Sequence, residues 1–385
     1  MEISRSTILN IPWIGHGDFG DEVMGYVLRS YLKEKGARAI IYYEKGVKDI
    51  YRDQNDLDIT FLHKHETPRI IKKLLDHLYF RKIDVVIIGG GSVLHSRNSI
   101  KWKLDIVKKI KKNTRPNKKI FCLAIGVSLG PFEYEEDKVL CAEFLDTMDG
   151  VVFRDMYSTH IGKTLSKNSV LLDSLDSSLL LPRLFHDKVN NIASLHPSDV
   201  NLVGLIFVQN ASDSFFDTQK NLEKFGKIVN YLISKGKRVR LISLYTGPAY
   251  KDNELIANLK NQAVDVTKVD THIFSGDIFR TISQMRECGY IISMRLHGII
   301  FSYLLQIPYL SLGYNQKNTN FCKSVNYPSN MCFDFYNLQS LDPVFEAITV
   351  LFDKGNDLFN ESKSLEECSK LVERNFDSIF KQPLT

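Results

Sequence analysis

The sequence predicts an α/β protein with two Rossmann-like domains, each built on a doubly wound parallel sheet. A chain of 385 residues is longer than one ordinary domain. Short apolar runs alternate with helical patterns along its whole length, as in repeated β-α-β units. The run 85–88 is apolar on both sides, which is typical of a strand covered by helices on both faces. Two such sheets are expected to face a cleft, with ligands beyond the carboxyl ends of the strands.

Nine runs are the expected strands, and a lapse in the pattern divides them into two groups. Between residues 182 and 200 prolines and polar residues replace the alternation, which predicts an interdomain linker. The expected domains are therefore 1–185 and 200–385, the second carrying the C-terminal helices. A helix expected over 361–380 could pack on either domain. The expected strands are 7–14, 38–43, 84–88, 119–125 and 151–153, then 201–208, 239–244, 290–293 and 309–312.

Composition excludes several classes of protein. With 44% hydrophobic and 25% charged residues, the chain is neither disordered, collagenous nor a coiled coil. A net charge of +5 over this length is no nucleic-acid signature. The six cysteines show no C-x-x-C spacing, so we interpret them as buried, reduced thiols rather than zinc or redox sites. No signal peptide or membrane-spanning run is evident, and a cytoplasmic location is expected.

One segment, Lys101–Lys119, is strongly basic: it carries nine Lys or Arg and a single acid. Its apolar residues fall at helical spacing on one face. One interpretation is a surface helix with a solvated basic face. The other is a patch that contacts anionic lipid, or a lipid-phosphate substrate, at the inner face of the membrane. The sequence leaves both open.

Residues 15–20 match the G-x-G-x-x-G pattern of dinucleotide-binding loops. They follow an expected strand and open a helix, and Glu44 ends the next strand. However, Asp18, Asp21 and Glu22 place negative charge where a pyrophosphate would bind the helix N-terminus, and this disfavours nicotinamide or flavin. An acidic loop is better suited to accept hydrogen bonds from sugar hydroxyls. The plain alternative is a tight turn with a helix cap.

A second glycine-rich segment, residues 89–91, follows the strand 84–88. Three glycines let a ligand approach bare backbone, and Ser92 and His95 follow closely. The lysine of a Walker A loop is absent, so ATP is not the expected ligand. A packing turn explains three glycines equally well.

Cationic side chains follow expected strands in both halves. Arg154 comes directly after one strand, Arg295 and His297 after another, and Lys317 lies in a polar loop after a third. Arginine offers a bidentate fork to carboxylate or phosphate, and histidine exchanges protons near neutral pH. Each alone has a structural explanation, such as an ion pair between Arg154 and Asp155. Together they predict a compact anionic ligand held between the domains.

At these residues the chain resembles the polysaccharide pyruvyl transferase family. The motifs occur in family order over roughly residues 7–320. The resemblance implies a glycosyltransferase-B-like fold, phosphoenolpyruvate as donor, and formation of a pyruvate ketal on a sugar of a capsular or other extracellular polysaccharide. The matching segments are Gly17–Glu22, Gly89–Leu94, Ile125–Pro131, Phe153–Ser158, Asp176, Arg295–Gly298, Ile307–Pro308 and Tyr314–Lys317.

The resemblance also implies roles for single residues. Arg154, Arg295, His297 and Lys317 would serve the donor or its chemistry, with His297 as the acid or base and Arg295 beside it. The family commonly has asparagine where Asp18 stands, so an acid there could orient or deprotonate an acceptor hydroxyl. His297, Arg295 and Asp18 are thus the expected catalytic residues.

The remaining expected substrate-binding residues, besides Arg154 and Lys317, are Asp21, Gly91 and Ser92 of the first domain, on the acceptor side. The second domain would hold the donor. Neither a resident cofactor nor a metal is expected, because cations neutralise the donor. The expected partners are phosphoenolpyruvate and a glycan acceptor, either free or lipid-linked.

Two alternatives stay open beside pyruvyl transfer. A glycosyltransferase that uses a nucleotide-sugar shares the expected architecture, and fold alone does not separate the two. A non-catalytic glycan-binding protein would bind sugar without releasing phosphate from phosphoenolpyruvate. A dinucleotide oxidoreductase is disfavoured by the acidic loop.

Overall fold

The chain folds into two compact units. A computed structural model describes residues 3–42, 78, 80–114, 117–168, 170–195, 198–209, 218–248, 251–314 and 316–381. The first unit comprises Met1–Gly15, Asp21–Leu184 and Ser369–Thr385, and the second comprises His16–Gly20 and Phe185–Cys368. The short segment His16–Gly20 therefore belongs to the second unit although the chain on either side of it belongs to the first.

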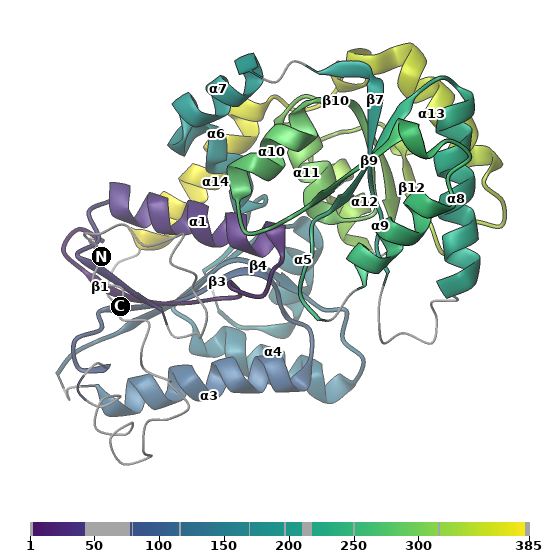
Figure 1. The fold of residues 1–385 in the computed structure, drawn as a ribbon. Coiled ribbons are helices and arrows are strands. Elements are labelled where there is room, and N and C mark those ends of the chain that lie inside the picture. The colour runs from purple at the N-terminus through teal and green to yellow at the C-terminus, as the bar shows by residue number, and fades with distance from the viewer. Residues whose placement is uncertain are drawn as a thin grey trace. The chain divides into compact units, whose positions relative to one another are not determined.

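The first unit is built on a parallel six-stranded sheet (Figure 1). Its strand order is β2-β1-β3-β4-β5-β6. The chain adds β2 on one side of β1 and all later strands on the other side, so the strand order reverses between β1 and β3. Largely apolar runs that are buried over their full length, such as β1 and β4, explain why these segments form central strands. The strands are β1 (Thr7–Pro12), β2 (Ala39–Tyr42), β3 (Val85–Leu94), β4 (Phe121–Leu129), β5 (Gly150–Phe153) and β6 (Leu171–Asp173).

Helices cover both faces of this sheet. Alternate strand residues, such as Val86 and Ile88, join Leu104 and Phe144 in one apolar core, so two helices cover that face. Figure 1 shows α3 and α4 on this side and α1 on the other. The unit's helices are α1 (Phe19–Glu34), α3 (Arg97–Asn113), α4 (Glu135–Thr147), α5 (Met156–Leu165), η2 (Ser177–Leu180), α6 (Leu181–Leu184) and, from Ser369 onward, α14 (Leu365–Phe380).

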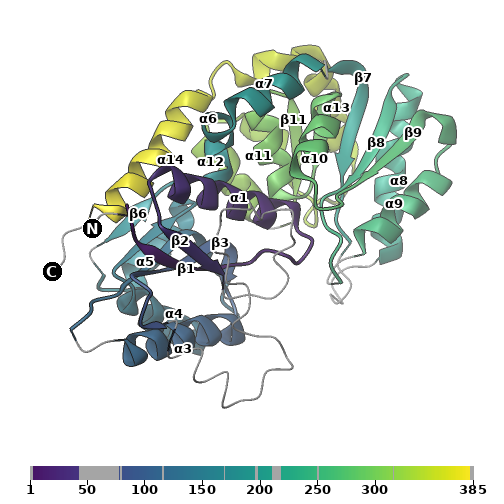
Figure 2. The ribbon, with the colours of Figure 1, turned by 60° about the vertical axis from the view of Figure 1, so that its left-hand side comes forward.

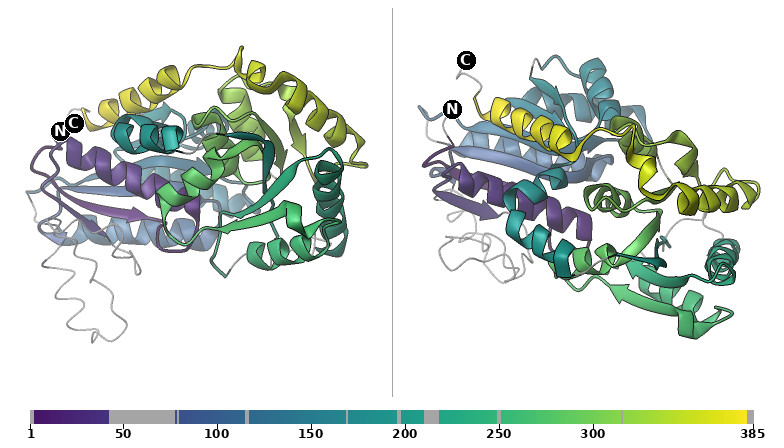
Figure 3. Two further views of the ribbon diagram at one scale, coloured as in Figure 1. Left: turned by 45° about the horizontal axis from the view of Figure 1, so that its top comes forward. Right: turned by 90° about the horizontal axis from the view of Figure 1, so that it is seen from above.

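The last helix, α14, packs on the first unit. Its Phe376 lies edge-to-face against Tyr31 of α1, with ring centroids 5.2 Å apart. Asn375 donates a hydrogen bond to the backbone oxygen of Asp173 in β6. Figure 3 shows α14 lying over strands of the first sheet. The second domain expected from sequence, 200–385, thus differs from the second unit, because an apolar face on α14 is covered by residues from the other end of the chain.

The second unit is also built on a parallel six-stranded sheet, in the order β12-β11-β10-β7-β8-β9. This is the Rossmann order, with the reversal between β7 and β10. Figure 2 shows α10 on the opposite side of β7–β9 from α8 and α9. The strands are β7 (Asp199–Ile206), β8 (Arg238–Ser243), β9 (Val269–Ile273), β10 (Cys288–Ser293), β11 (Tyr309–Gly313) and β12 (Cys332–Asp334). The helices are α7 (His186–Leu195), α8 (Thr218–Ser234), α9 (Asp252–Asn261), α10 (Ile278–Arg286), α11 (Leu296–Leu304), α12 (Gln316–Ser324) and α13 (Asp342–Lys354), with the short η3 (Val266–Lys268), η4 (Ser329–Met331) and η5 (Gly355–Phe359).

The expected α/β class with two doubly wound parallel sheets is confirmed. The division between the two units falls between Leu184 and Phe185, within the expected linker 182–200. That stretch also contains helix α7, which lies beside α10 through the ring contact of Phe185 with Phe279, centroids 5.8 Å apart. One local prediction is wrong. The triglycine 89–91 does not follow its strand but lies inside β3, which runs on to Leu94 because the sheet pairing continues past it. The cysteines are unpaired, and burial raises the pKa of Cys122 to about 12.

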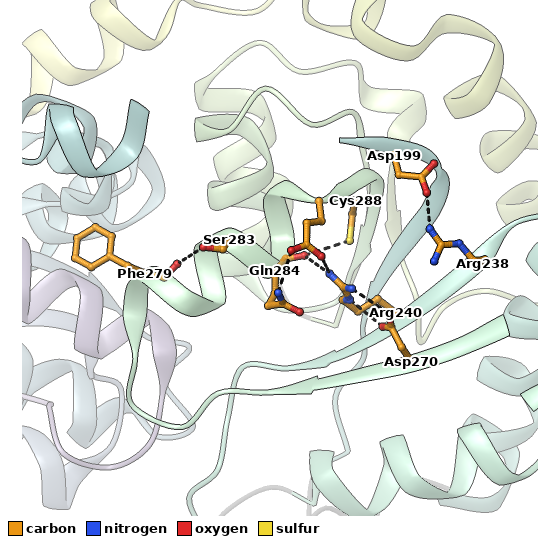
Figure 4. A network of polar contacts seen from close by, with 9 residues as sticks. Asp199, Arg238, Arg240, Asp270, Phe279, Ser283, Gln284 and Cys288 are labelled. Carbon is orange, nitrogen blue, oxygen red and sulfur yellow. Dashed lines mark hydrogen bonds and ion pairs between the residues drawn. The ribbon is translucent and has the colours of Figure 1, made fainter. Parts of the chain in front are cut away.

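Arg240 anchors a structural ion network near the amino ends of the strands, away from their carboxyl ends. It binds Asp270 across the β8–β9 pair at 2.8 and 3.0 Å, and Glu287 at 2.6 Å (Figure 4). Arg238 pairs with Asp199 in the same region. Both arginines are thus occupied in joining strands and α10, which distinguishes them from arginines placed after strand ends.

His272, buried in β9, makes the stability of the second unit depend on pH. Its Nε2 lies 3.0 Å from the Thr281 hydroxyl, and burial, aided by Arg280 and Arg240, lowers its pKa to about 4. Between about pH 6.5 and about pH 4, His272 is protonated in the unfolded chain but neutral in the folded chain, so the free energy of unfolding falls as the pH falls.

We expect the free energy of unfolding in urea to drop by about 2 kcal/mol on this account between about pH 7 and about pH 4.5. The variant His272→Gln should remove that part of the pH dependence. The control His160→Gln, at an exposed position on α5, should retain it. Equal pH dependence in wild type and His272→Gln would contradict the assignment.

Candidate functional site

The second unit places Arg295 and His297 at the carboxyl edge of its sheet. Arg295 follows β10 directly and is the N-cap residue of α11, and His297 lies in the first turn of that helix. Because β10 adjoins β7 at the reversal of strand order, both residues stand where doubly wound sheets bind ligands.

Arg295 is a buried cation held by a buried carboxylate. Its Nε and Nη2 both donate to Asp252 Oδ2, at 2.9 and 2.6 Å, and its guanidinium lies over the Tyr245 ring, 5.1 Å from the centroid. The other oxygen of Asp252 accepts a hydrogen bond from the backbone N–H of Gln209, just beyond β7. Burial alone would lower the pKa of Arg295, but Asp252 raises it, and the arginine stays charged. Burial raises the pKa of Asp252, although Arg295 lowers it.

Backbone hydrogen bonds hold the segment His16–Gly20 against the residues that follow β8, at the carboxyl edge of the second sheet. Phe19 N–H donates to Leu244 O, and Thr246 N–H donates to Gly17 O, both at 2.9 Å. The Phe19 ring is fully buried against Phe274 and Phe301, with centroids 5.4 and 4.8 Å away. This anchoring brings Asp18 to the site.

Asp18 lies beside Arg295, with 3.8 Å between its Oδ2 and Nη1. Its Oδ1 accepts a hydrogen bond from Gly20 N–H at 2.9 Å. The separation from Arg295 exceeds a hydrogen bond, so the two groups interact by charge rather than by a direct bond.

Close packing explains the glycines of the G-x-G-x-x-G pattern. A Cβ on Gly17 would lie 2.7 Å from the Thr246 hydroxyl, and one on Gly20 would lie 1.7 Å from His297 Nδ1. Gly17 also has a φ of +76°. The missing side chain of Gly20 therefore makes room for the His297 ring. Glu44, the acid at the end of the next strand in the dinucleotide-binding pattern, lies outside the described residues.

Lys317 lies one strand away from His297. The sequence predicts a polar loop there, but α12 begins at Gln316, so Lys317 is in its first turn, just beyond β11. Asn318 is buried and donates a hydrogen bond to Met294 O at 2.9 Å. This bond ties the first turn of α12 to the end of β10, next to Arg295 in the chain.

In the first unit a second arginine after a strand is held in a similar way. Arg154 is buried, its Nε donates to the Ser128 hydroxyl at 2.6 Å, and its Nη1 donates to Asp176 Oδ2 at 3.3 Å. The ion pair with Asp155 that the sequence suggested is not observed; Asp155 instead caps α5 by accepting from Ser158 N–H at 2.7 Å.

Gly91 and Asp21 meet within the first unit. A Cβ on Gly91 would lie 2.5 Å from Asp21 Oδ1, and Gly90 and Gly91 have φ of +63° and +85°. The glycines thus let β3 approach the first turn of α1, as a packing turn would. The side chain of Ser92 lies outside the described set. Substrate contact at Asp21, Gly91 and Ser92 stays a prediction.

The structure brings three predicted residues together in the second unit: Asp18, Arg295 and His297. Arg154 belongs to the first unit, and its convergence with them on one ligand stays a prediction. Sequence reasoning missed Asp252, Tyr245 and Asn318. Asp252 carried no signal because it opens an ordinary helix, where an acid is expected for capping.

Several lysines of the basic segment Lys101–Lys119 form ion pairs or hydrogen bonds with other residues of the first unit. Lys108 pairs with Glu143, and Lys111 donates to the backbone oxygen of Thr147 at 2.7 Å. Lys118 pairs with Asp84 at 2.8 Å. Among the described helices, none combines the length and the apolar character that crossing a bilayer requires. Contact with anionic lipid stays a prediction.

Among the residues that the structure describes, no three His, Cys, Asp or Glu side chains are grouped as a metal ion would need.

The carboxyl edges of both sheets therefore carry fixed arginines, and comparison with known proteins gives the class. The family model for polysaccharide pyruvyl transferase matches residues 18–316. The chain belongs to this family and is a transferase. The matched range contains Asp18, Arg154 and the Arg295–His297 segment. A search of curated proteins found no match.

Solved structures that resemble the chain share its fold at low sequence identity. UDP-GlcNAc 2-epimerase from Neisseria meningitidis is 11% identical with a TM-score of 0.64, over 98% of this chain and 100% of that one. The enzyme from Methanocaldococcus jannaschii is 11% identical with a TM-score of 0.61, over 98% and 99%. That from Rickettsia bellii is 9% identical with a TM-score of 0.63, over 98% and 96%. The fold is thus glycosyltransferase-B-like.

The carboxylates that hold the two arginines should matter for stability. We expect Asp252→Asn to lower the free energy of unfolding by about 3 kcal/mol, because it leaves the Arg295 guanidinium buried without its counter-charge. The double variant Asp252→Asn/Arg295→Met should recover part of the loss. Urea unfolding of both, beside the control Asp105→Asn at an exposed position of α3, measures this. An Asp252→Asn protein as stable as wild type would contradict the role.

Proposed function

We propose that this transferase moves the pyruvyl group of phosphoenolpyruvate onto two hydroxyls of one sugar. The product is a cyclic pyruvate ketal on a surface polysaccharide or on its lipid-linked precursor, and phosphate is released. The observation that carries the proposal is Arg295: a buried, permanently charged guanidinium at a strand end, two residues before His297 and 3.8 Å from Asp18. Membership of a pyruvyl transferase family supports it.

The donor requires fixed positive charge. Phosphoenolpyruvate carries a phosphate and a carboxylate around a vinyl carbon, and a cation whose position is set in advance binds both with little reorganisation. Asp252 holds Arg295 through Nε and Nη2, so Nη1 is the nitrogen on the side of Asp18. We assign donor binding to Arg295 and to Lys317 at the start of α12, with Arg154 as a further donor ligand from the first unit.

The chemistry proceeds by protonation and two additions. A general acid, for which His297 is the candidate, protonates the methylene carbon of the enol ester and leaves an oxocarbenium-like carbon at C2. One sugar hydroxyl adds to C2 as it loses its proton. The second hydroxyl then displaces phosphate from C2: its oxygen bonds to C2, its proton passes to the departing phosphate, and the C2–O bond to phosphate breaks with its electron pair on phosphate, so the ketal closes and inorganic phosphate leaves. No oxidant, metal or resident cofactor enters this balance.

Asp18 is the candidate base for the acceptor. Its Oδ1 is oriented by Gly20 N–H, and its Oδ2 is near Arg295, so the carboxylate has a fixed direction. A fixed carboxylate can accept the proton of the attacking hydroxyl. Asp21, Gly91 and Ser92 remain candidates for acceptor contact in the first unit. A cytoplasmic location at the inner face of the membrane suits a lipid-linked acceptor.

Incubation with phosphoenolpyruvate and a panel of glycan acceptors tests the function. We expect inorganic phosphate to appear together with an acceptor mass gain that corresponds to a pyruvate ketal. His297→Ala should lower kcat by at least about a hundred-fold because the general acid is lost, while donor binding measured by calorimetry is retained. UDP-sugars should neither bind nor react. Turnover of a UDP-sugar, or sugar binding with no phosphate release, would favour one of the two alternatives.

A second prediction concerns the backbone that faces His297. Gly20→Ala adds only a methyl group, yet that group would lie 1.7 Å from His297 Nδ1, so the ring must move. We expect a large fall in kcat, and the overpacking should also lower the free energy of unfolding by about 1–3 kcal/mol, which leaves the protein folded at low temperature. Gly226→Ala on α8, where an added Cβ meets nothing within 4 Å, is the matched control and should keep full activity. Wild-type turnover in Gly20→Ala would remove His297 from the reaction.

A further inference from the structure

The two tryptophans of the chain lie on the first unit and contact the same lysine. Trp13 follows β1 by one residue, Trp102 lies on α3, and their side chains are 42% and 38% exposed. The ammonium of Lys103 lies 5.9 Å from the Trp13 ring centroid and 5.2 Å from that of Trp102. Large aromatic side chains are costly to expose to water, so two of them around one cation need an explanation.

Lys103 is itself unusual because it is only 2% exposed. A buried ammonium must be satisfied, and its Nζ donates to the Ser99 hydroxyl at 2.8 Å. The two indole rings add attraction through cation–π contacts. Ser99 in turn donates to Val93 O, at 2.7 Å, so the lysine is tied to β3. This chain of contacts fixes both rings in advance of any ligand.

The position of the pair in the sheet indicates a ligand site. β1 and β3 are the neighbours at which the strand order of the first sheet reverses, and Trp13 follows the first of them. α3, which carries Trp102, follows the second. In doubly wound sheets ligands bind at this reversal, beyond the carboxyl ends of the strands.

We propose that Trp13, Trp102 and Lys103 form a saccharide subsite that holds a pyranose ring of the acceptor glycan. The proposal rests on the proposed function and deepens it by naming where the acceptor binds. An indole presents a flat face to the C–H side of a sugar ring and an N–H to its hydroxyls, so it matches a ligand that is apolar on its faces and polar on its rim. Rings held by a buried cation bind such a ligand with little loss of conformational freedom.

A lipid surface is the competing occupant of this face. Other lysines of α3, such as Lys112, are exposed and stand where they can meet a membrane. The cation between the two indoles is different, because Lys103 is buried and presents little charge to a membrane. The contacts around the tryptophans themselves therefore favour a sugar ring, and vesicles form one arm of the test.

Tryptophan fluorescence tests the subsite directly, because both tryptophans of the protein belong to it. The probes are methyl glycosides of glucose, galactose, mannose and N-acetylglucosamine, titrated into the full-length protein. We expect a saturable emission change for at least one glycoside. Its Kd should rise about ten-fold in Trp102→Ala, less in Trp102→Phe, and not at all in Lys112→Ala, an exposed lysine on the same helix. Calorimetry gives the same comparison where the tryptophan signal is lost.

The outcomes separate the subsite from the function. Phosphate release from phosphoenolpyruvate with an unchanged acceptor KM in both Trp13→Ala and Trp102→Ala would overturn the subsite and leave pyruvyl transfer standing. Glycoside binding that needs the tryptophans, with no phosphate release for any acceptor, would support the subsite and count against pyruvyl transfer. An emission change with vesicles of phosphatidylcholine and phosphatidylglycerol but with no glycoside would overturn the subsite in favour of membrane contact. No response to either probe would also overturn it.

Discussion

The Arg295 guanidinium is buried, and the chemistry proposed for the second unit depends on the Asp252 carboxylate, which keeps the guanidinium charged and fixed in position. Burial of a lone cation costs several kcal/mol, and a carboxylate that accepts two of the cation's hydrogen bonds and is itself held by a further one offsets that cost. Asp252 meets both conditions, since Oδ2 accepts twice from Arg295 and Oδ1 accepts from Gln209 N–H. The result is a charge whose position does not change when an anion arrives.

The same constraint recurs in the first unit, where Asp176 holds Arg154. In each unit the arginine follows a strand, and its carboxylate comes from a separate element of the same unit. Asp176 follows β6, later in the chain than Arg154, and Asp252 begins α9, earlier in the chain than Arg295. Asp155, the nearest carboxylate to Arg154, is occupied as a helix cap.

The sequence was sufficient for the central strands and for the residues after them, because runs such as Val85–Ile88 have few other interpretations. It missed β6, β9 and β12, which are short strands at sheet edges with little apolar signal. Asp252 could not be found either, since its role depends on a contact 43 positions along the chain. The acidic charge of the G-x-G-x-x-G pattern disfavours a dinucleotide and can be read from the sequence, but the packing reason for Gly20 lies in His297, far away in sequence.

In the proposed reaction, fixed charge at the strand end binds the donor. The most direct measurement is a crystal structure of the protein with phosphoenolpyruvate bound. The account predicts the phosphate or the carboxylate of the donor within hydrogen-bond distance of Arg295, with the Asp252 pair intact and the His297 imidazole directed at the methylene carbon. A donor bound without any contact to Arg295 would contradict it.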